Sequence, residues 1–167
     1  YSTAFNYNPN ATIDDGSCCH TSSSSDSIAQ IGQSLYGDAT WDNFGYSVSM
    51  SDDGNIMAVG APYVDGNQNN DGSVSVYQNV NNTWIQLGQD IYGEDIEDNS
   101  GQSVSISGDG DIVAIGAVGN NGNGNNSGHV RVYNYNGSSW TQLGQDIDGE
   151  SSDDLSGYSV SLSSDGN

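Results

Sequence analysis

A 56-residue repeat is the strongest constraint on the fold of this chain. The segment Gln86–Ile91 reads QLGQDI and returns unchanged at Gln142–Ile147, a shift of 56 positions. Across residues 86–111 and 142–167, 17 of 26 positions are identical without a gap. The same shift towards the N-terminus reaches Gln30–Leu35, which reads QIGQSL. A period of this length predicts several equivalent structural units packed side by side.

Each repeat carries the pattern of four short β-strands. The first strand alternates large residues with serine and is followed by an Asp-Gly pair, which marks a tight turn. This strand is predicted at Phe44–Ser51, Ser100–Ser107 and Ser156–Ser163. The second is a continuous apolar run that we expect to be buried on both faces, the third follows a long Asn/Gly loop, and the fourth carries a tryptophan. These three strands are predicted at 56–59, 73–77 and 83–89, and again at 112–115, 129–133 and 139–145.

Four antiparallel strands in a repeat of this length are typical of a β-propeller blade. We therefore predict an all-β fold with complete blades at 44–91 and 100–147, inside a repeat region that spans 28–167. A linear β-solenoid or an open sandwich is the alternative. The serines of the first strand would let neighbouring blades approach closely, unless they only mark a solvent-facing surface. We expect the following side chains to be buried together, with their equivalents 56 residues later: Val48, Met50, Ile56, Val59, Val74, Val76, Trp84 and Leu87.

The ends of the repeat region predict incomplete blades. Ile28–Leu35 aligns with Trp84–Ile91 and would be an isolated fourth strand, whereas Ser156–Asn167 would be a first strand and turn. A propeller ring needs about four to eight blades. We therefore expect either a longer parent protein of about seven blades or copies that exchange strands and polymerise into a filament.

The charge of the chain excludes two classes of partner. The formal net charge is −21, and Arg131 is the single basic residue among Lys and Arg. Nucleic-acid binding is excluded because the chain has almost no cations with which to neutralise phosphates. Attachment to an anionic membrane surface is disfavoured for the same reason. No apolar run approaches the ~20 residues that span a bilayer, so we expect no membrane insertion.

Two short motifs resemble those of the FG-GAP repeat family. Phe44-Gly45 is followed by Gly60-Ala61-Pro62, and later copies keep part of the pattern at Gly101, Gly116-Ala117 and Gly157. The resemblance to FG-GAP blades, such as those of the integrin alpha subunit, implies an extracellular propeller used for cell adhesion and ligand binding. Integrin-type blades often carry a calcium loop between the two motifs. Here Ser51–Asn55 is too short to supply six or more oxygen ligands.

The first 27 residues differ from the repeats. Residues 1–20 form a short acidic, Cys-containing motif, and 21–27 form a Ser-rich linker. Ala4–Ala11 and Asp14–Cys18 resemble Cys-flanked repeats in secreted proteins of marine bacteria. Cys18 and Cys19 are adjacent, so we expect disulfides to cysteines outside this chain, in an oxidising compartment.

The acidic loops between repeats are the candidate metal site. Hard carboxylate oxygens at this density suit Ca²⁺, and the candidate ligands are Asp95, Glu97, Asp98, Asp153 and Asp154. Four-stranded blades place these loops and the loops 63–72 and 118–128 on one face. The alternative is that the acidic loops only keep the protein soluble. Candidate glycosylation sequons, which would make the chain a glycoprotein, begin at Asn10, Asn81, Asn125 and Asn136.

Other chemistry has little support in the sequence. Without a Cys-x-x-Cys motif and with only His20 and His129, a zinc site is not expected, and His129 reads as an ordinary strand residue. An enzyme would need polar residues that depart from the repeat and converge on one cleft, and the sequence shows no such set, so we do not expect an enzyme. We therefore expect a secreted, non-enzymatic adhesion or structural protein that associates with itself or with another surface protein or glycan. The alternative is a calcium-dependent, lectin-like adhesin, which should show a pocket with clustered aromatic side chains.

Overall fold

The computed structural model describes residues 29–167, of which Ile31–Asn167 form one compact unit. The predictions for 1–20 and 21–27, including Cys18, Cys19 and Asn10, lie outside the described residues. The described part of the chain consists of strands, turns and loops. None of its segments is a helix that could cross a membrane.

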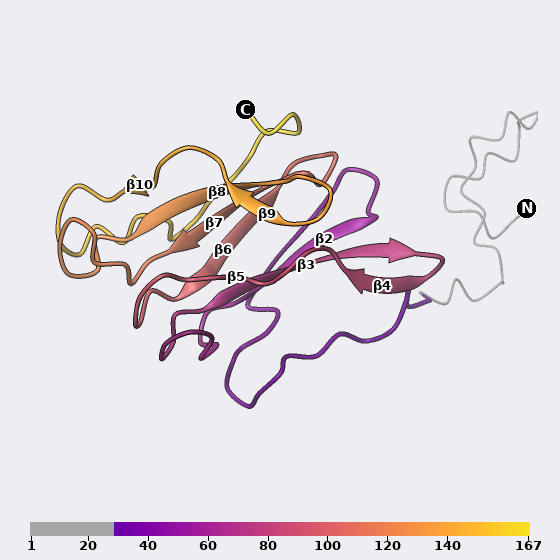
Figure 1. Cartoon of the computed structure of the whole chain (residues 1–167), viewed down its shortest axis with the longest axis horizontal. Coiled ribbons are helices and arrows are strands. Elements are labelled where there is room, and N and C mark those ends of the chain that lie inside the picture. Colours follow the sequence, from indigo (N-terminus) through magenta and orange to yellow (C-terminus); the bar gives the residue numbers. More distant parts are fainter. Residues whose placement is uncertain (1–28) are drawn as a thin grey trace, which may run out of the picture. The chain divides into compact units, whose positions relative to one another are not determined.

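The predicted all-β fold is confirmed, and each complete repeat builds one antiparallel sheet (Figure 1). In the first sheet β1, β2, β3 and β4 are neighbours in that order, and β5 also pairs with β3. Their bounds are Ser47–Met50, Ile56–Ala61, Ser73–Val80, Thr83–Gln86 and Ile91–Tyr92. The second sheet repeats this order with β6, β7 and β8, while β9 and β10 both pair with β8. Their bounds are Ser100–Ile106, Ile112–Ala117, His129–Tyr135, Trp140–Gln142 and Ile147–Asp148.

The predicted fourth strand is interrupted in both repeats. β4 ends at Gln86 rather than at Gln89, and the chain resumes pairing with β3 only at Ile91. The break coincides with Gly88, whose φ of 78° lies in the left-handed region and turns the strand out of line. Gly144, with φ of 79°, breaks the second copy in the same way.

The hydrophobic core draws on both sheets. Its buried side chains are Ala58, Val74, Val76, Ile91, Ile106, Val113, Ile115 and Trp140. β6 lies next to β1 and β2, as Figure 1 shows in the middle of the molecule. The expected burial of Val59, Val74 and Val76 is confirmed, while Ile56 and Leu87 are half-buried.

The serines of the first strand face the neighbouring repeat. Ser47 Oγ donates to the Gly101 carbonyl at 2.7 Å, and Ser103 Oγ donates to the Gly157 carbonyl at the same distance. Two residues further along β1, Ser49 Oγ accepts a hydrogen bond from the Ile106 amide at 3.1 Å. The interpretation that these serines allow close approach of two blades is therefore confirmed. We call this contact the seam, defined by Ser47, Ser49 and Gly60 on one side and Gly101 and Ile106 on the other.

Glycines complete the seam where a side chain would not fit. A Cβ atom at Gly60 would collide with the Gly101 carbonyl of the next repeat, and one at Gly116 would collide with the Gly157 carbonyl. Gly101 and Gly157 also have φ of 89° and 84°, which side chains rarely adopt. Gly60 belongs to the Gly-Ala-Pro motif, and Gly101 is equivalent to the glycine of the Phe-Gly motif. The two motifs that resemble the FG-GAP family thus meet across the seam.

The expected burial of Val48 and Met50 is wrong. They are 53% and 47% exposed, whereas their equivalent positions, Val104 and Ile106, are half-buried and buried. Strand alternation places these apolar side chains opposite the serines, on the side that faces a preceding blade. The first sheet covers β6 on that side, and no described strand covers β1.

The presence or absence of a covering neighbour also explains why the burial predicted for one tryptophan and one leucine is wrong. Trp84 is only half-buried, whereas Trp140 is 4% exposed because it packs on the segment that leaves the first sheet. Leu87 packs against the core, but its equivalent Leu143 is 52% exposed. No later tryptophan among the described residues packs over Leu143.

The predicted strands at the two ends are not formed. In the described part of Ile28–Leu35 the chain is irregular, and Ser156–Ser163 makes only an isolated bridge from Ser156 to Gly128. A strand needs a hydrogen-bonded neighbour along its length, and neither segment has one among the described residues. Residues 31–33 instead bind Trp84: the Trp84 indole Nε1 donates to the Ile31 carbonyl at 3.1 Å, and Gln33 bonds to the Trp84 backbone.

Candidate functional site

Two sets of loops lie together on one face of the sheets, as predicted. The loop after β5 runs beside the loop between β2 and β3, because the Glu97 amide donates to the Asn69 carbonyl and the Ser100 amide to the Asp71 carbonyl, both at 3.0 Å. The next repeat copies these bonds from Asp153 and Ser156. This shared surface, which we call the loop face, therefore collects the acidic residues of both repeats.

Two of the five predicted calcium ligands hold their own loops. The buried Asp98 carboxylate accepts hydrogen bonds from the Glu94 and Asp95 amides and from the Asn120 side chain. Burial raises the pKa of Asp98 above its ordinary value. Asp154 accepts from the Ser151 amide in the same position of the next loop. These carboxylates therefore fix the loop backbone.

The other predicted ligands lie at the loop surface. Asp95 accepts a hydrogen bond from the Ile96 amide, while Glu97 and Asp153 are exposed and have φ of 61° and 65°. Among the described residues, the side chains close enough to share a metal ion are Glu94, His129 and Asp146, which the sequence prediction did not select. Calcium binding by the five predicted carboxylates stays a prediction.

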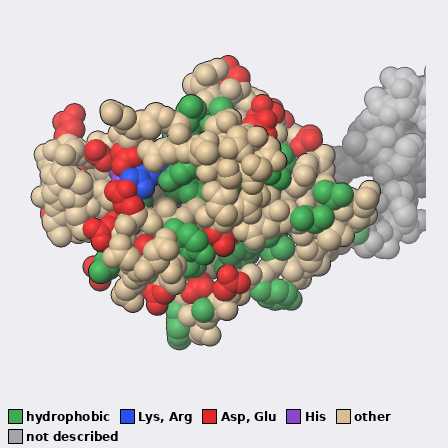
Figure 2. Space-filling model, viewed as in Figure 1, with side chains coloured by type: hydrophobic (Ala, Val, Ile, Leu, Met, Phe, Trp, Pro, Cys, Tyr) green, Lys and Arg blue, Asp and Glu red, His purple; other side chains and the backbone are tan. Residues whose placement is uncertain are grey.

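A cluster of charged side chains lies between the two sheets. Glu94 follows β5 of the first sheet, while His129 and Arg131 lie on β8 and Asp146 precedes β10 in the second. Arg131 donates from Nε and Nη2 to the two oxygens of Asp146 at 2.9 and 2.7 Å, and Nη2 also contacts Glu94. We call these four residues the inter-blade cluster. In Figure 2 the single basic side chain is surrounded by carboxylates.

Arg131 sets the charge state of its main partner. The hydrogen bond from the guanidinium lowers the pKa of Asp146 below its ordinary value. Because Glu94 and Asp146 come from different sheets, the guanidinium also joins the two blades electrostatically.

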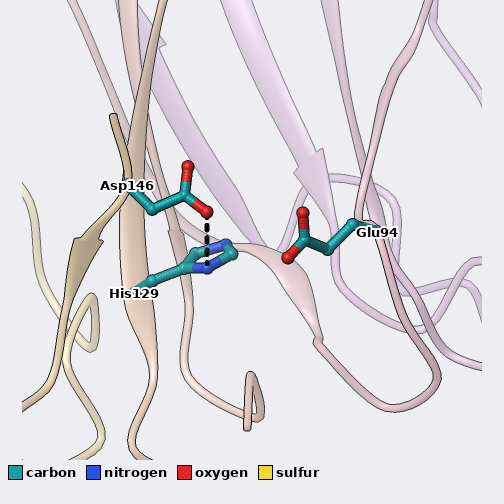
Figure 3. Close-up of side chains that lie close together, drawn as sticks. All are labelled: Glu94, His129 and Asp146. Atoms are coloured by element: carbon teal, nitrogen blue, oxygen red, sulfur yellow. Dashed lines mark ion pairs between the residues drawn. The ribbon is translucent and has the colours of Figure 1, made fainter. Parts of the chain in front are cut away.

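His129 is the buried member of the inter-blade cluster. It is 2% exposed, and its Nδ1 lies 3.9 Å from Asp146 Oδ2 and 4.0 Å from Asp148 Oδ1, too far for a hydrogen bond. Among the described residues, this nitrogen is a buried side-chain atom without a hydrogen-bond partner. Figure 3 shows the imidazole ring below the Asp146 carboxylate, with Glu94 beside it. His129 therefore lies on a strand, as expected, but the charged side chains around it and its unpaired nitrogen are not those of an ordinary strand residue.

The sequence contains a signal for this cluster. His129 and Arg131 are equivalent to Ser73 and Ser75 of the preceding repeat. Two neighbouring serines that face one side of β3 are thus replaced by histidine and arginine at the same sites of β8. A departure from the repeat at adjacent same-face positions marks local chemistry more clearly than the acidic loops, which recur in both repeats.

A pocket of about 610 Å³ opens on the loop face of the first sheet. Its aromatic walls are Trp41, Tyr63 and Tyr92, and its acidic walls include Asp42 and Asp65. Trp41 is 84% exposed and has φ of 81°, an unusual conformation for a bulky residue. The turn that holds it is fixed by a 2.8 Å hydrogen bond from the Ala39 amide to Asp42.

The three described sequons lie at the surface. Asn81 and Asn125 are exposed. The Asn136 side chain is also exposed and accepts hydrogen bonds from the backbone amides of Ser138 and Ser139 in its turn. Glycosylation at these positions stays a prediction.

Comparison with known proteins agrees with the repeat architecture. Residues 37–77 and 95–133 each match the family model of the FG-GAP repeat. A search of curated proteins found no match to the chain. Each matched segment runs from the loop before the first strand into the third strand of one sheet. The two sheets of this all-β chain are therefore similar to FG-GAP repeats and have the build of β-propeller blades.

Proposed function

We propose that the chain is a secreted, non-enzymatic module that binds other proteins, including further copies of itself, through the faces of its blades. The similarity to FG-GAP repeats supports a protein-interaction role, and such repeats are common in extracellular proteins. The proposal is carried by the exposed apolar face of β1. The equivalent face of β6 is covered by the first sheet at the seam, whereas no described strand covers this face of β1.

The two outer sides of the described blades carry opposite halves of one seam. On one side Val48 and Met50 are exposed, although the equivalent Ile106 is only 6% exposed at the seam. On the other side Ser159 and Ser161, equivalent to Ser47 and Ser49, are exposed. Exposed apolar side chains on a sheet face mark an interaction surface. Because the two sides are complementary and differ, copies would add head to tail and could extend into an extracellular filament.

Light scattering and electron microscopy of the whole chain test this proposal. We expect the mass of the particles to grow with protein concentration. Replacing Val48 and Met50 by Asp should leave a monomer, because charged side chains cannot be buried in an apolar seam without a partner. Ile96→Asp is the matched control, since Ile96 is 49% exposed but lies in a loop. A parent chain that stays monomeric at every concentration contradicts self-association.

A second candidate function, calcium-dependent carbohydrate binding, is favoured by the pocket at Trp41. Exposed aromatic rings can stack on the apolar faces of sugars, while carboxylates and amides accept and donate hydrogen bonds to hydroxyl groups. The pocket places Trp41, Tyr63 and Tyr92 beside Asp42 and Asp65. These three aromatic side chains at one pocket support the second candidate.

Binding to an array of oligosaccharides, with and without calcium, tests this second candidate. We expect Trp41→Ala to abolish binding without changing the fold, because this side chain is exposed. Tyr158→Ala is the control, since Tyr158 is 68% exposed but does not line the pocket. Equal binding by the two variants would exclude the pocket as a sugar site.

A further inference from the structure

We propose that Glu94, His129 and Asp146 bind a divalent ion of the zinc class between the two blades. The site differs from the predicted calcium loops and takes no part in the proposed seam or sugar pocket. Its donor atoms come from both repeats, so the ion would join the blades as the ion pairs of Arg131 with Glu94 and Asp146 do.

The first argument is the state of His129. A buried imidazole nitrogen without a hydrogen bond is unfavourable, because it has lost water and gained nothing in return. Nδ1 of His129 is in this state, on a side chain that is 3% exposed. Aspartate oxygens lie 3.9 and 4.0 Å away, a gap that no hydrogen bond closes. A metal ion between the nitrogen and these oxygens would satisfy both.

The second argument is distance. One donor atom from each of Glu94, His129 and Asp146 lies within 4.8 Å of the other two. Zinc bonds of about 2.0–2.2 Å place ligand atoms roughly 3–3.6 Å apart. The required contraction is small, and the Glu94 side chain, which is 47% exposed, would exchange its contact with Arg131 for the ion. Figure 3 shows the Asp146 carboxylate above the imidazole ring and the Glu94 carboxylate beside it.

The third argument is charge. Glu94, Asp146 and Asp148 are three carboxylates, and Arg131 is the one cation beside them, which leaves a net formal charge of −2 with His129 neutral. A divalent cation would neutralise this charge. Arg131 holds the carboxylates together but competes with the ion for Glu94 and for Oδ2 of Asp146.

The donor set selects the kind of ion. An imidazole nitrogen and carboxylate oxygens are all zinc ligands, and three protein ligands leave a fourth position for water. Calcium prefers six to eight oxygen ligands and gains little from a histidine nitrogen. The site should therefore bind zinc in preference to calcium.

Isothermal titration with zinc chloride tests the proposal on the full chain. Cys18, Cys19 and His20 also offer zinc ligands, so the parent protein for the test carries Cys18→Ser, Cys19→Ser and His20→Ala. We expect one zinc ion per chain, and an excess of calcium should not displace it from this site. His129→Ser should weaken zinc binding by at least about 10-fold, the loss that even indirect changes around a metal cause.

The preceding repeat supplies matched variants that suit the strand. Positions 73 and 75 are serines in β3, so His129→Ser and Arg131→Ser restore residues that this fold already accepts. Arg131→Ser should strengthen zinc binding by roughly 10-fold, since it removes a repelling charge beside the ion. Glu94→Gln, at an exposed position, should weaken it. Failure of the parent to bind zinc, or equal affinity in the parent and His129→Ser, overturns the proposal.

Discussion

At the scale of single residues, a Ser-x-Asp turn recurs in all three copies of the repeat. Ser107 Oγ donates to Asp109 at 2.6 Å and accepts from the Ile112 amide at 3.0 Å, so one hydroxyl closes the turn between β6 and β7. Ser51 does the same with Asp53 and the Ile56 amide. These bonds explain why the turn retains both residues in each copy.

The turn makes a prediction about pH. The hydrogen bond from Ser107 lowers the pKa of Asp109 below its ordinary value of 3.8. A lowered pKa means that the carboxylate stabilises the fold above pH 3.8 and that this contribution is lost as the pH falls through the lowered pKa. Ser107→Ala should return the Asp109 pKa towards 3.8, as NMR titration of the carboxyl carbon would show. The pKa of Asp165, which bonds to Ser163, is the internal control and should not move.

At the scale of the element, a tryptophan clamp fastens each fourth strand to the preceding repeat. The Trp140 indole donates to the Leu87 carbonyl at 2.7 Å, and its backbone exchanges two hydrogen bonds with the Gln89 side chain. Residues 31–33 hold Trp84 with the same three bonds. The repeated Gln-x-Gly-Gln motif is therefore the socket for the tryptophan of the following blade.

The clamp predicts unequal costs for the two tryptophans. Trp140→Ala should lower the free energy of unfolding by ~3–5 kcal/mol, because a fully buried aromatic side chain is lost. Trp84→Ala should cost less, since Trp84 is half-buried. Urea unfolding of both variants measures the difference. Equal losses would mean that the two clamps are buried to the same extent in solution.

The glycines of the seam predict a steric effect. Gly60→Ala should lower the free energy of unfolding by about 1–3 kcal/mol, because the added methyl group meets the Gly101 carbonyl and Ser47 Oγ. Ser49→Ala is the comparison: it removes the hydrogen bond from the Ile106 amide without adding volume, at a cost of about 1 kcal/mol. A neutral Gly60→Ala variant in urea unfolding would show that the strands are further apart than the seam requires.

At the scale of the whole molecule, the net charge of −21 acts on every measurement of stability. Self-repulsion among these carboxylates destabilises a compact state, and any salt screens it. A stabilising effect of calcium is therefore informative only against sodium at the same ionic strength. This comparison distinguishes two explanations of the acidic loops: that they bind calcium, or that they only keep the protein soluble.

We predict that calcium chloride raises the melting temperature more than sodium chloride does at equal ionic strength. The excess should shrink when Asp95→Asn and Glu97→Gln are combined, because these side chains lie at the surface of one of the two acidic loops. Asp98 is left unchanged, since its buried carboxylate holds the loop backbone. Identical melting curves in the two salts would leave the loops with a solubility role.

The sequence by itself determined the repeat, the order of the strands and the places where the chain turns. These features depend on neighbouring residues: the alternation of Val104 and Ile106 with serine, and the Ser-x-Asp-Gly turns. A period of 56 residues then assigns the same local structure to each complete copy. The fold class followed from these local patterns.

Only the tertiary structure decided which of the equivalent residues are buried and which side chains meet. Val48 and Ile106 follow the same alternation, yet their exposed fractions differ because a neighbouring sheet covers β6 and no described strand covers β1. His129 and Glu94 are far apart in sequence and meet because a loop of the first sheet lies against a strand of the second. Alternation defines the two faces of a strand, but burial and chemistry depend on what packs against each face.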